Sequence, residues 1–139
     1  MTGHGLSFDH FGLATRDPER TLSVLRGLGY STPAVVHDPL QGVNLVLCEH
    51  PAMPAVEVIF ADGTAGPLDA VLAQQPQSIY HLCFRSDDLT STLASLKAQG
   101  QRAMVVSPPK PAVLFGGRSV SFHMVRGFGL IEILESTHE

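Results

Sequence analysis

The sequence predicts an α+β protein made of two copies of one unit, in which a strand and a helix are followed by three more strands. The segment DHFGLATRD resembles YHLCFRSDD further along, and in each a histidine opens an apolar strand. The histidines, His10 and His81, lie 71 residues apart, and so do two predicted helix-ending glycines, Gly29 and Gly100. A fixed offset of this kind indicates a duplicated supersecondary unit.

Length and composition are those of an ordinary globular domain. The chain has 139 residues, 44% hydrophobic and 16% charged, so we expect a single domain over 1–139 with modules at 6–61 and 78–136. The net charge of −4 argues against a nucleic-acid partner. The absence of a long apolar run and of a secretory signal predicts a cytoplasmic protein with no membrane partner.

The first module begins with an apolar strand at 6–15. Asp17 and Pro18 are typical of a helix start, because an aspartate caps the first N–H groups and proline suits the first turn. Gly29 is typical of a helix end. Three strands are then predicted, at 34–37, 43–48 and 56–60.

The segment 62–77 connects the modules and carries a short predicted helix at 68–75. In the second module, a strand starts at Ile79, and Asp87 or Asp88 caps a helix that Gly100 ends. A strand is predicted at 102–106, then a loop rich in proline and glycine at 107–117, and finally strands at 118–125 and 129–135.

Two glutamates, Glu57 and Glu132, stand inside otherwise apolar strands, each the last strand of its module. An unpaired carboxylate there costs several kcal/mol or takes up a proton. A divalent cation shared by these carboxylates and by His10 and His81 would remove that cost. Such a nitrogen and oxygen donor set suits Co, Ni, Mn, Zn or Fe, with Mg less favoured. The alternative is that all four are incidental polar residues, such as rim histidines and glutamates facing solvent.

At this point the motifs resemble the vicinal oxygen chelate superfamily, also called the glyoxalase/bleomycin resistance/dioxygenase superfamily. DHFGLA is similar to its first metal strand, YHLCFRSDDL to its second, and GLIEIL to its terminal glutamate strand. The resemblance covers residues 8–135. It implies two βαβββ modules whose curved sheets enclose a metal-containing cup.

Within the superfamily the chain is most similar to the methylmalonyl-CoA epimerase branch, through Gln41-Gly42-Val43 and two further glycine-containing motifs, Gly66-Pro67-Leu68 and Gly116-Gly117-Arg118. The resemblance implies four metal ligands: His10, Glu57, His81 and Glu132. Two positions depart from the epimerase pattern. Glu57 stands where the epimerases usually have glutamine, and in this it resembles glyoxalase I. Leu40 stands where the epimerases have a glutamate that serves as a catalytic base. Asp38 lies two residues away and is a candidate substitute.

The resemblance implies a metal-dependent epimerase or isomerase, or a lyase like glyoxalase I, which removes a proton next to a carbonyl or thioester. Glu132 is the first candidate base and Glu57 the second. The expected substrate is a small molecule such as a CoA or other acyl thioester, and the expected assembly is a homodimer. The alternatives are an Fe(II)-dependent dioxygenase and a non-catalytic drug-binding protein of the same superfamily.

The sequence leaves the roles of two further residues open. Arg85 shares a strand face with His81, so it either meets a substrate carboxylate or forms a salt bridge at the rim. His123 falls in a strand close to Glu132, and its orientation depends on the strand register.

Overall fold

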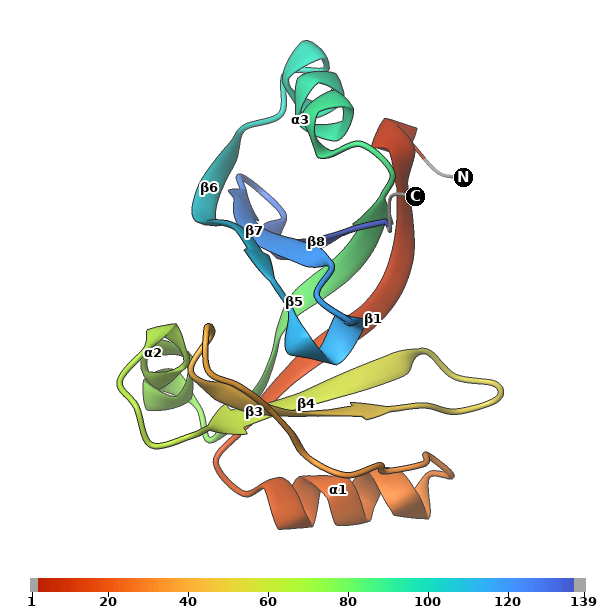
Figure 1. Cartoon of the computed structure of the whole chain (residues 1–139), viewed down its shortest axis with the longest axis vertical. Coiled ribbons are helices and arrows are strands. Elements are labelled where there is room, and N and C mark those ends of the chain that lie inside the picture. Colours follow the sequence, from red (N-terminus) through yellow and green to blue (C-terminus); the bar gives the residue numbers. More distant parts are fainter. Residues whose placement is uncertain (1–2, 137–139) are drawn as a thin grey trace. The chain divides into compact units, whose positions relative to one another are not determined.

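A computed structural model describes residues 3–136 of the chain, with eight strands and three α-helices (Figure 1). These residues form two compact units, His10–Tyr80 and the remaining described residues, 3–9 with 81–136. Strands β1 (Leu6–Thr15) and β5 (Gln77–Ser86) contribute residues to both units. In chain order, a strand, a helix and three strands occur twice, which confirms the predicted fold class. Over the described range, no helix is both long enough and apolar enough to cross a membrane.

The unit His10–Tyr80 contains a sheet with the strand order β2-β3-β4-β1. β4 runs parallel to β1 and antiparallel to β3, which is in turn antiparallel to β2. A parallel neighbour requires a long connection, and α1 together with the β2–β3 hairpin supplies it. The bounds of the elements are α1 at Pro18–Gly27, β2 at Val36–Asp38, β3 at Val43–Cys48, β4 at Ala55–Ala61 and α2 at Pro67–Gln74.

Local signals place α1 as predicted. The Asp17 carboxylate accepts a hydrogen bond of 3.1 Å from the Arg20 N–H, and Pro18 occupies the first turn. Gly29 has φ of 99°, a left-handed conformation that favours glycine, and it directly follows the helix cap Leu28. The helix therefore begins and ends for reasons contained in its own sequence.

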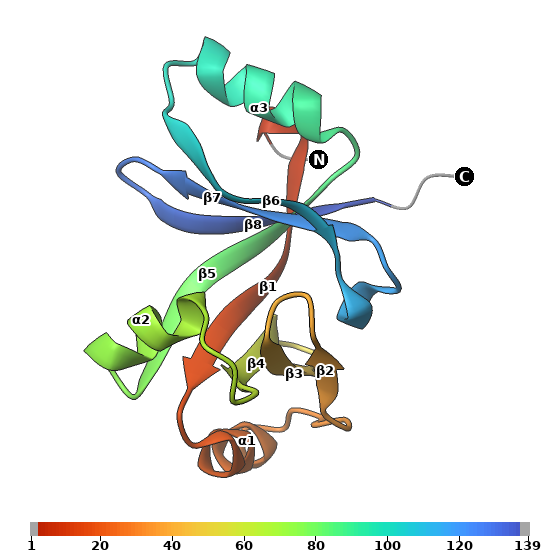
Figure 2. The same cartoon turned by 60° about the vertical axis from the view of Figure 1, so that its left-hand side comes forward.

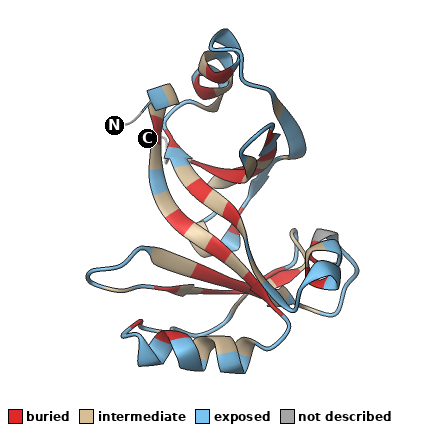
Figure 3. Cartoon of the chain, turned by 180° about the vertical axis from the view of Figure 1, so that it is seen from behind, coloured by how far each residue is buried: buried red, intermediate tan, exposed pale blue. Residues whose placement is uncertain are grey.

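The two faces of this sheet have different roles. One face packs against α1 and forms an apolar core around Leu25, Tyr30, Val46, Cys48 and Val58. The opposite face carries His10 and Glu57, because the parallel register pairs Gly12 with Glu57 and alternate residues share a face. Figure 3 shows that buried residues gather on the strands whereas α1 exposes much of its surface. The polar pair is thus on the side away from the helix, as the alternation of β1 predicts.

The other unit contains a sheet in the order β5-β8-β7-β6. β5 and β8 are parallel, and β8, β7 and β6 pair as antiparallel neighbours. The short helical turn η1 (Gly3–Gly5) lies beside α3, where His4 Nδ1 is 2.9 Å from Ser95 Oγ (Figure 2). The bounds of the elements are α3 at Leu89–Ala98, β6 at Ala103–Pro111, β7 at Ser119–Val125 and β8 at Gly129–Glu135, with a 3-10 turn η2 at Val113–Phe115.

Most boundaries lie within two residues of the prediction, and the largest difference is at the end of β6. β6 continues to Pro111, whereas the sequence predicts a loop from Ser107 onward. The ladder with β7 persists through register shifts on either side of Ser107. Prolines are tolerated in this strand because β6 is at the sheet edge, where a missing N–H need not cost a ladder hydrogen bond.

Candidate metal-ligating residues and the adjacent turn

The first predicted pair, His10 and Glu57, is brought together inside the unit His10–Tyr80. His10 Nε2 lies 3.6 Å from Glu57 Oε1, and the side chains are 0% and 4% exposed. The residues come from the adjacent parallel strands β1 and β4, where Glu57 is the ladder partner of Gly12. Glycine at this position adds no side chain to the sheet face beside Glu57.

The second predicted pair, His81 and Glu132, is brought together inside the other unit. His81 Nε2 lies 3.0 Å from Glu132 Oε1, and the side chains are 0% and 3% exposed. The Phe122 ring meets the imidazole edge-to-face at a centroid distance of 5.3 Å and an interplanar angle of 84°. Phe122 is also the ladder partner of Glu132. This packing restricts the orientation of the imidazole.

The two pairs have the same place in their respective ladders. Glu57 is the partner of Gly12, and Glu132 is the partner of Cys83. Each partner stands two residues after the histidine of its module, although the histidines are 71 residues apart and the glutamates 75. The duplication is therefore preserved in three dimensions, where sequence spacing alone would place the second glutamate four residues out of phase.

The donor set fits a transition-metal ion. All four side chains are buried, and each offers one nitrogen or oxygen atom able to ligate a metal. Buried carboxylates are stable only when paired, hydrogen-bonded or bound to a cation. Imidazole nitrogen suits Zn, Fe, Co and Ni, and carboxylate oxygen broadens the set to Mn and Mg.

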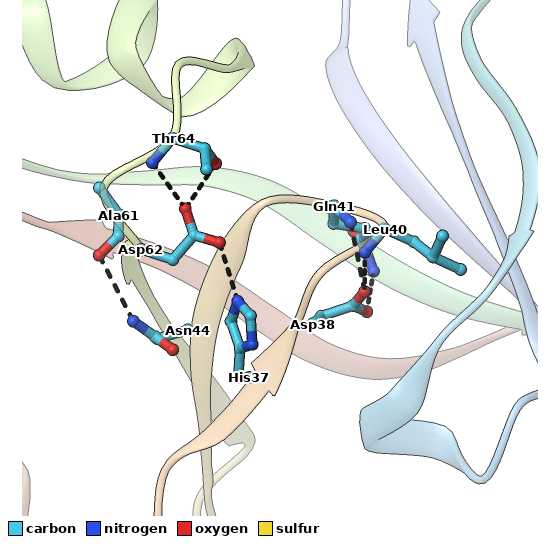
Figure 4. Close-up of polar contacts among 8 residues, drawn as sticks. All are labelled: His37, Asp38, Leu40, Gln41, Asn44, Ala61, Asp62 and Thr64. Carbon is cyan, nitrogen blue, oxygen red and sulfur yellow. Dashed lines mark hydrogen bonds and ion pairs between the residues drawn. The ribbon is translucent and has the colours of Figure 1, made fainter.

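The turn between β2 and β3 is held by a buried carboxylate, shown in Figure 4. Asp38 Oδ1 accepts hydrogen bonds from the backbone N–H groups of Leu40 and Gln41, at 3.1 and 3.2 Å. Its Oδ2 accepts a third from Gln41 Nε2 at 2.8 Å. Asp38 is fully buried, whereas Leu40 is 58% exposed. The carboxylate therefore positions the turn, and the side chain that the turn presents is apolar.

A second polar cluster lies next to this turn, and the sequence does not predict it. His37 Nε2 lies 2.9 Å from Asp62 Oδ2, and the Thr64 hydroxyl donates to Asp62 Oδ1 at 2.6 Å (Figure 4). The hydrogen bonds from Thr64, together with His37, lower the pKa of Asp62 to about 2. The sequence signal was Asp-Gly-Thr, an Asx turn, but nothing in it identified His37 as the partner.

The remaining candidates take structural roles. Arg85 Nη1 donates to Asp9 Oδ1 at 3.1 Å, which is the salt-bridge alternative considered for this residue. His123 lies on the face opposite Glu132, since it pairs with Ile131, and its Nε2 is 2.9 Å from Ser121 Oγ. Burial lowers the pKa of His123. Burial likewise raises the pKa of the Cys48 thiol to about 11, against a smaller opposing effect of Arg26.

Comparison with known proteins agrees with the fold. The family model described as Glyoxalase/Bleomycin resistance protein/Dioxygenase superfamily matches residues 9–122. Among curated protein sequences, none matches the chain.

Solved structures of three proteins superpose over nearly the whole chain. The methylmalonyl-CoA epimerase from Mycobacterium tuberculosis has a TM-score of 0.79 and 19% identity, covering 99% of this chain and 93% of its own. A hypothetical protein from Bacillus halodurans has a TM-score of 0.78 and 18% identity, covering 96% of each chain. A variant Streptomyces coelicolor methylmalonyl-CoA epimerase in complex with 2-nitronate-propionyl-CoA has a TM-score of 0.67 and 19% identity, covering 94% and 97%. At such identities these likenesses show a common fold.

Proposed function

The chain belongs to the glyoxalase/bleomycin resistance protein/dioxygenase superfamily, and from that premise we propose that it is a metal-dependent enzyme that removes a proton from the carbon next to a carbonyl or thioester. The observation that carries the proposal is the pair of buried His–Glu contacts, 3.6 Å and 3.0 Å long, in equivalent ladder positions. A duplicated pair of metal-ligating side chains is what one shared cation site between repeated modules requires.

In the proposal, the two modules act as one domain and hold one divalent ion through His10, Glu57, His81 and Glu132. The candidate ions are Co, Ni, Mn, Zn, Mg and Fe, with the imidazoles favouring the transition metals over Mg. When bound, such an ion supplies Lewis acidity, which favours loss of a proton from the carbon next to a carbonyl. The four side chains supply the ligands, and all four are buried from solvent.

Glu132 is the proposed base and Glu57 the alternative. A carboxylate beside the reacting carbon can accept a proton when it comes within hydrogen-bond distance of that proton and its pKa lies near the working pH. Glu132 is preferred because it stands in the strand that resembles the terminal glutamate strand of the superfamily. In the proposal, His81 Nε2, which lies 3.0 Å from that carboxylate, ligates the same ion.

The turn at Leu40 favours a reaction with one base. Epimerisation with two bases needs a proton acceptor on each face of the carbon. The leucine side chain at position 40 cannot accept a proton. Asp38 does not take over this role, because its carboxylate oxygens accept three hydrogen bonds within the turn and the residue is fully buried. We therefore propose a proton shift run by one glutamate, on an acyl thioester such as a CoA ester, in a cytoplasmic homodimer. Methylmalonyl-CoA is the first substrate to try, since two of the structural neighbours are methylmalonyl-CoA epimerases.

The test is the metal content of the purified protein, measured by elemental analysis after dialysis against each candidate ion. We expect one divalent ion per chain, a loss of that ion in His81→Ala, and weaker retention in Glu57→Gln. His37→Ala is the matched control, because His37 is a histidine of the same chain outside the proposed ligands and should leave the metal content unchanged. Absence of a stoichiometric ion from the wild-type protein would favour the drug-binding alternative and overturn the proposal. Oxygen consumption instead of solvent deuterium incorporation at the α-carbon would favour the dioxygenase.

A further inference from the structure

The edge of the sheet at β6 has an unprotected half. Among the described residues β6 pairs only with β7, so its outer backbone groups have no strand partner. The second half of the strand carries Pro108, Pro109 and Pro111, which block pairing with another chain. The first half, 103–106, contains no proline and no charge. Its large apolar side chains are strongly exposed, with Met104 at 72%, Val105 at 57% and Val106 at 57%.

A groove accompanies this half of the strand. It has a volume of about 780 Å³ and lies between the last turns of α3 and the start of β6. Leu93, Met104 and Met124 line it with apolar surface. Figure 1 shows the short connection from α3 to β6, which is the edge strand of this unit. An open strand edge beside an apolar groove is the arrangement that binds a peptide by addition of a strand.

The groove is basic at one end. Lys97, Arg102 and Arg126 line it, and the Arg126 N–H donates to the Arg102 carbonyl at 2.9 Å, so the two arginines stand at the same end of the β6–β7 ladder. Within residues 3–136, none of these three side chains takes part in an ion pair or hydrogen bond. Three uncompensated cations in a chain of net charge −4 favour an anionic partner.

The charges also argue against a second copy of this chain as the occupant. The groove of a second copy is lined by the same three cations and by no Asp or Glu, so a two-fold contact offers Lys97, Arg102 and Arg126 no carboxylate from this face. We propose that the β6 edge and the adjoining groove bind an extended segment of a partner protein, apolar along its length and acidic at one end. Its backbone pairs with 103–106, its apolar side chains fill the groove, and its carboxylates meet Lys97, Arg102 and Arg126.

The experiment uses the full-length wild-type protein and a fluorescein-labelled peptide of alternating valine and threonine that ends in three glutamates. Binding is followed by fluorescence anisotropy, and hydrogen exchange of the 103–106 amides is measured in the same complex. We expect saturable binding, slower exchange at those amides, and affinity reduced about tenfold or more by raising the salt from 50 to 500 mM. The double variant Arg102→Glu/Arg126→Glu should bind about tenfold more weakly or worse.

Lys110→Glu is the matched control, because Lys110 is an exposed cation of the same strand outside the groove, and it should bind as the wild type does. Thermal unfolding confirms that the variants are folded, and the salt dependence tests the proposal on wild-type protein alone. Equal binding of a peptide ending in three lysines would overturn the proposal, as would unchanged hydrogen exchange at 103–106. A self-association that the charge reversals strengthen would assign the edge to a second copy instead.

Discussion

His81 Nε2 lies 3.0 Å from Glu132 Oε1, and both side chains are buried in the ladder formed by the parallel strands β5 and β8. A parallel pair cannot be closed by a tight turn, and the long connection between these two strands runs through α3, β6 and β7. The corresponding contact of His10 with Glu57 is 3.6 Å and depends in the same way on α1, β2 and β3. The candidate site is thus built from long-range contacts within each module.

Removal of the proposed base should stop proton transfer while the fold survives. Glu132→Gln keeps the shape of the side chain and removes its ability to accept a proton. We expect deuterium incorporation at the α-carbon of methylmalonyl-CoA to fall about a hundredfold or more. The control is Glu135→Gln, at the end of the same strand, which should incorporate deuterium at the wild-type rate. A greater loss in Glu57→Gln than in Glu132→Gln would instead assign the base to Glu57.

Restoring a carboxylate at position 40 should add a second base. Leu40 is 58% exposed, so Leu40→Glu is expected to change the free energy of unfolding by less than about 0.5 kcal/mol. Inversion of methylmalonyl-CoA should become about a hundredfold faster. Deuterium exchange on the face of the α-carbon at which Glu132 is the proposed base should keep its wild-type rate. The measurement compares chiral inversion with deuterium incorporation. Leu40→Gln is the control, and an equal acceleration in both variants contradicts a role in proton transfer.

The β2–β3 turn should lose stability when its carboxylate is removed. Asp38→Ala leaves the N–H groups of Leu40 and Gln41 without their acceptor and removes the bond from Gln41 Nε2. We expect the free energy of unfolding to fall by about 2–4 kcal/mol in urea titrations. Asp38→Asn keeps one oxygen acceptor and should lose less than half of that amount. Equal losses in the two variants would show that the negative charge, rather than the acceptor geometry, holds the turn.

Acid should weaken the cluster around Asp62. The pKa of Asp62 in the folded protein is about 2, below its ordinary value of 3.8, chiefly because of hydrogen bonds from Thr64. A lowered pKa means that the stabilisation is complete above about pH 4 and is lost as the pH falls through 2. The difference in unfolding free energy between wild type and Asp62→Asn should therefore shrink between pH 5 and pH 2. A difference that stays constant over this range contradicts the assignment.

Much of the fold could be predicted from the sequence because its signals are local. Asp17 and Gly29 bound α1 through a capping hydrogen bond and a left-handed backbone, and both effects depend only on neighbouring residues. The alternation along β1 placed His10 on the face away from α1, which follows from strand geometry. The extension of β6 to Pro111 was missed, because the tolerance of proline depends on that strand being at the edge of the sheet.

The sequence by itself determined that two histidines and two glutamates, each in an otherwise apolar segment, recur in matching modules. Only the tertiary structure decided the register that places Glu57 beside Gly12 and Glu132 beside Cys83, since the glutamates do not keep the spacing of the histidines. It also decided that Asp38 is occupied within its own turn and that Arg85 pairs with Asp9. These outcomes depend on hydrogen bonds and ladder pairs between particular backbone and side-chain groups, which become defined only when the strands assemble.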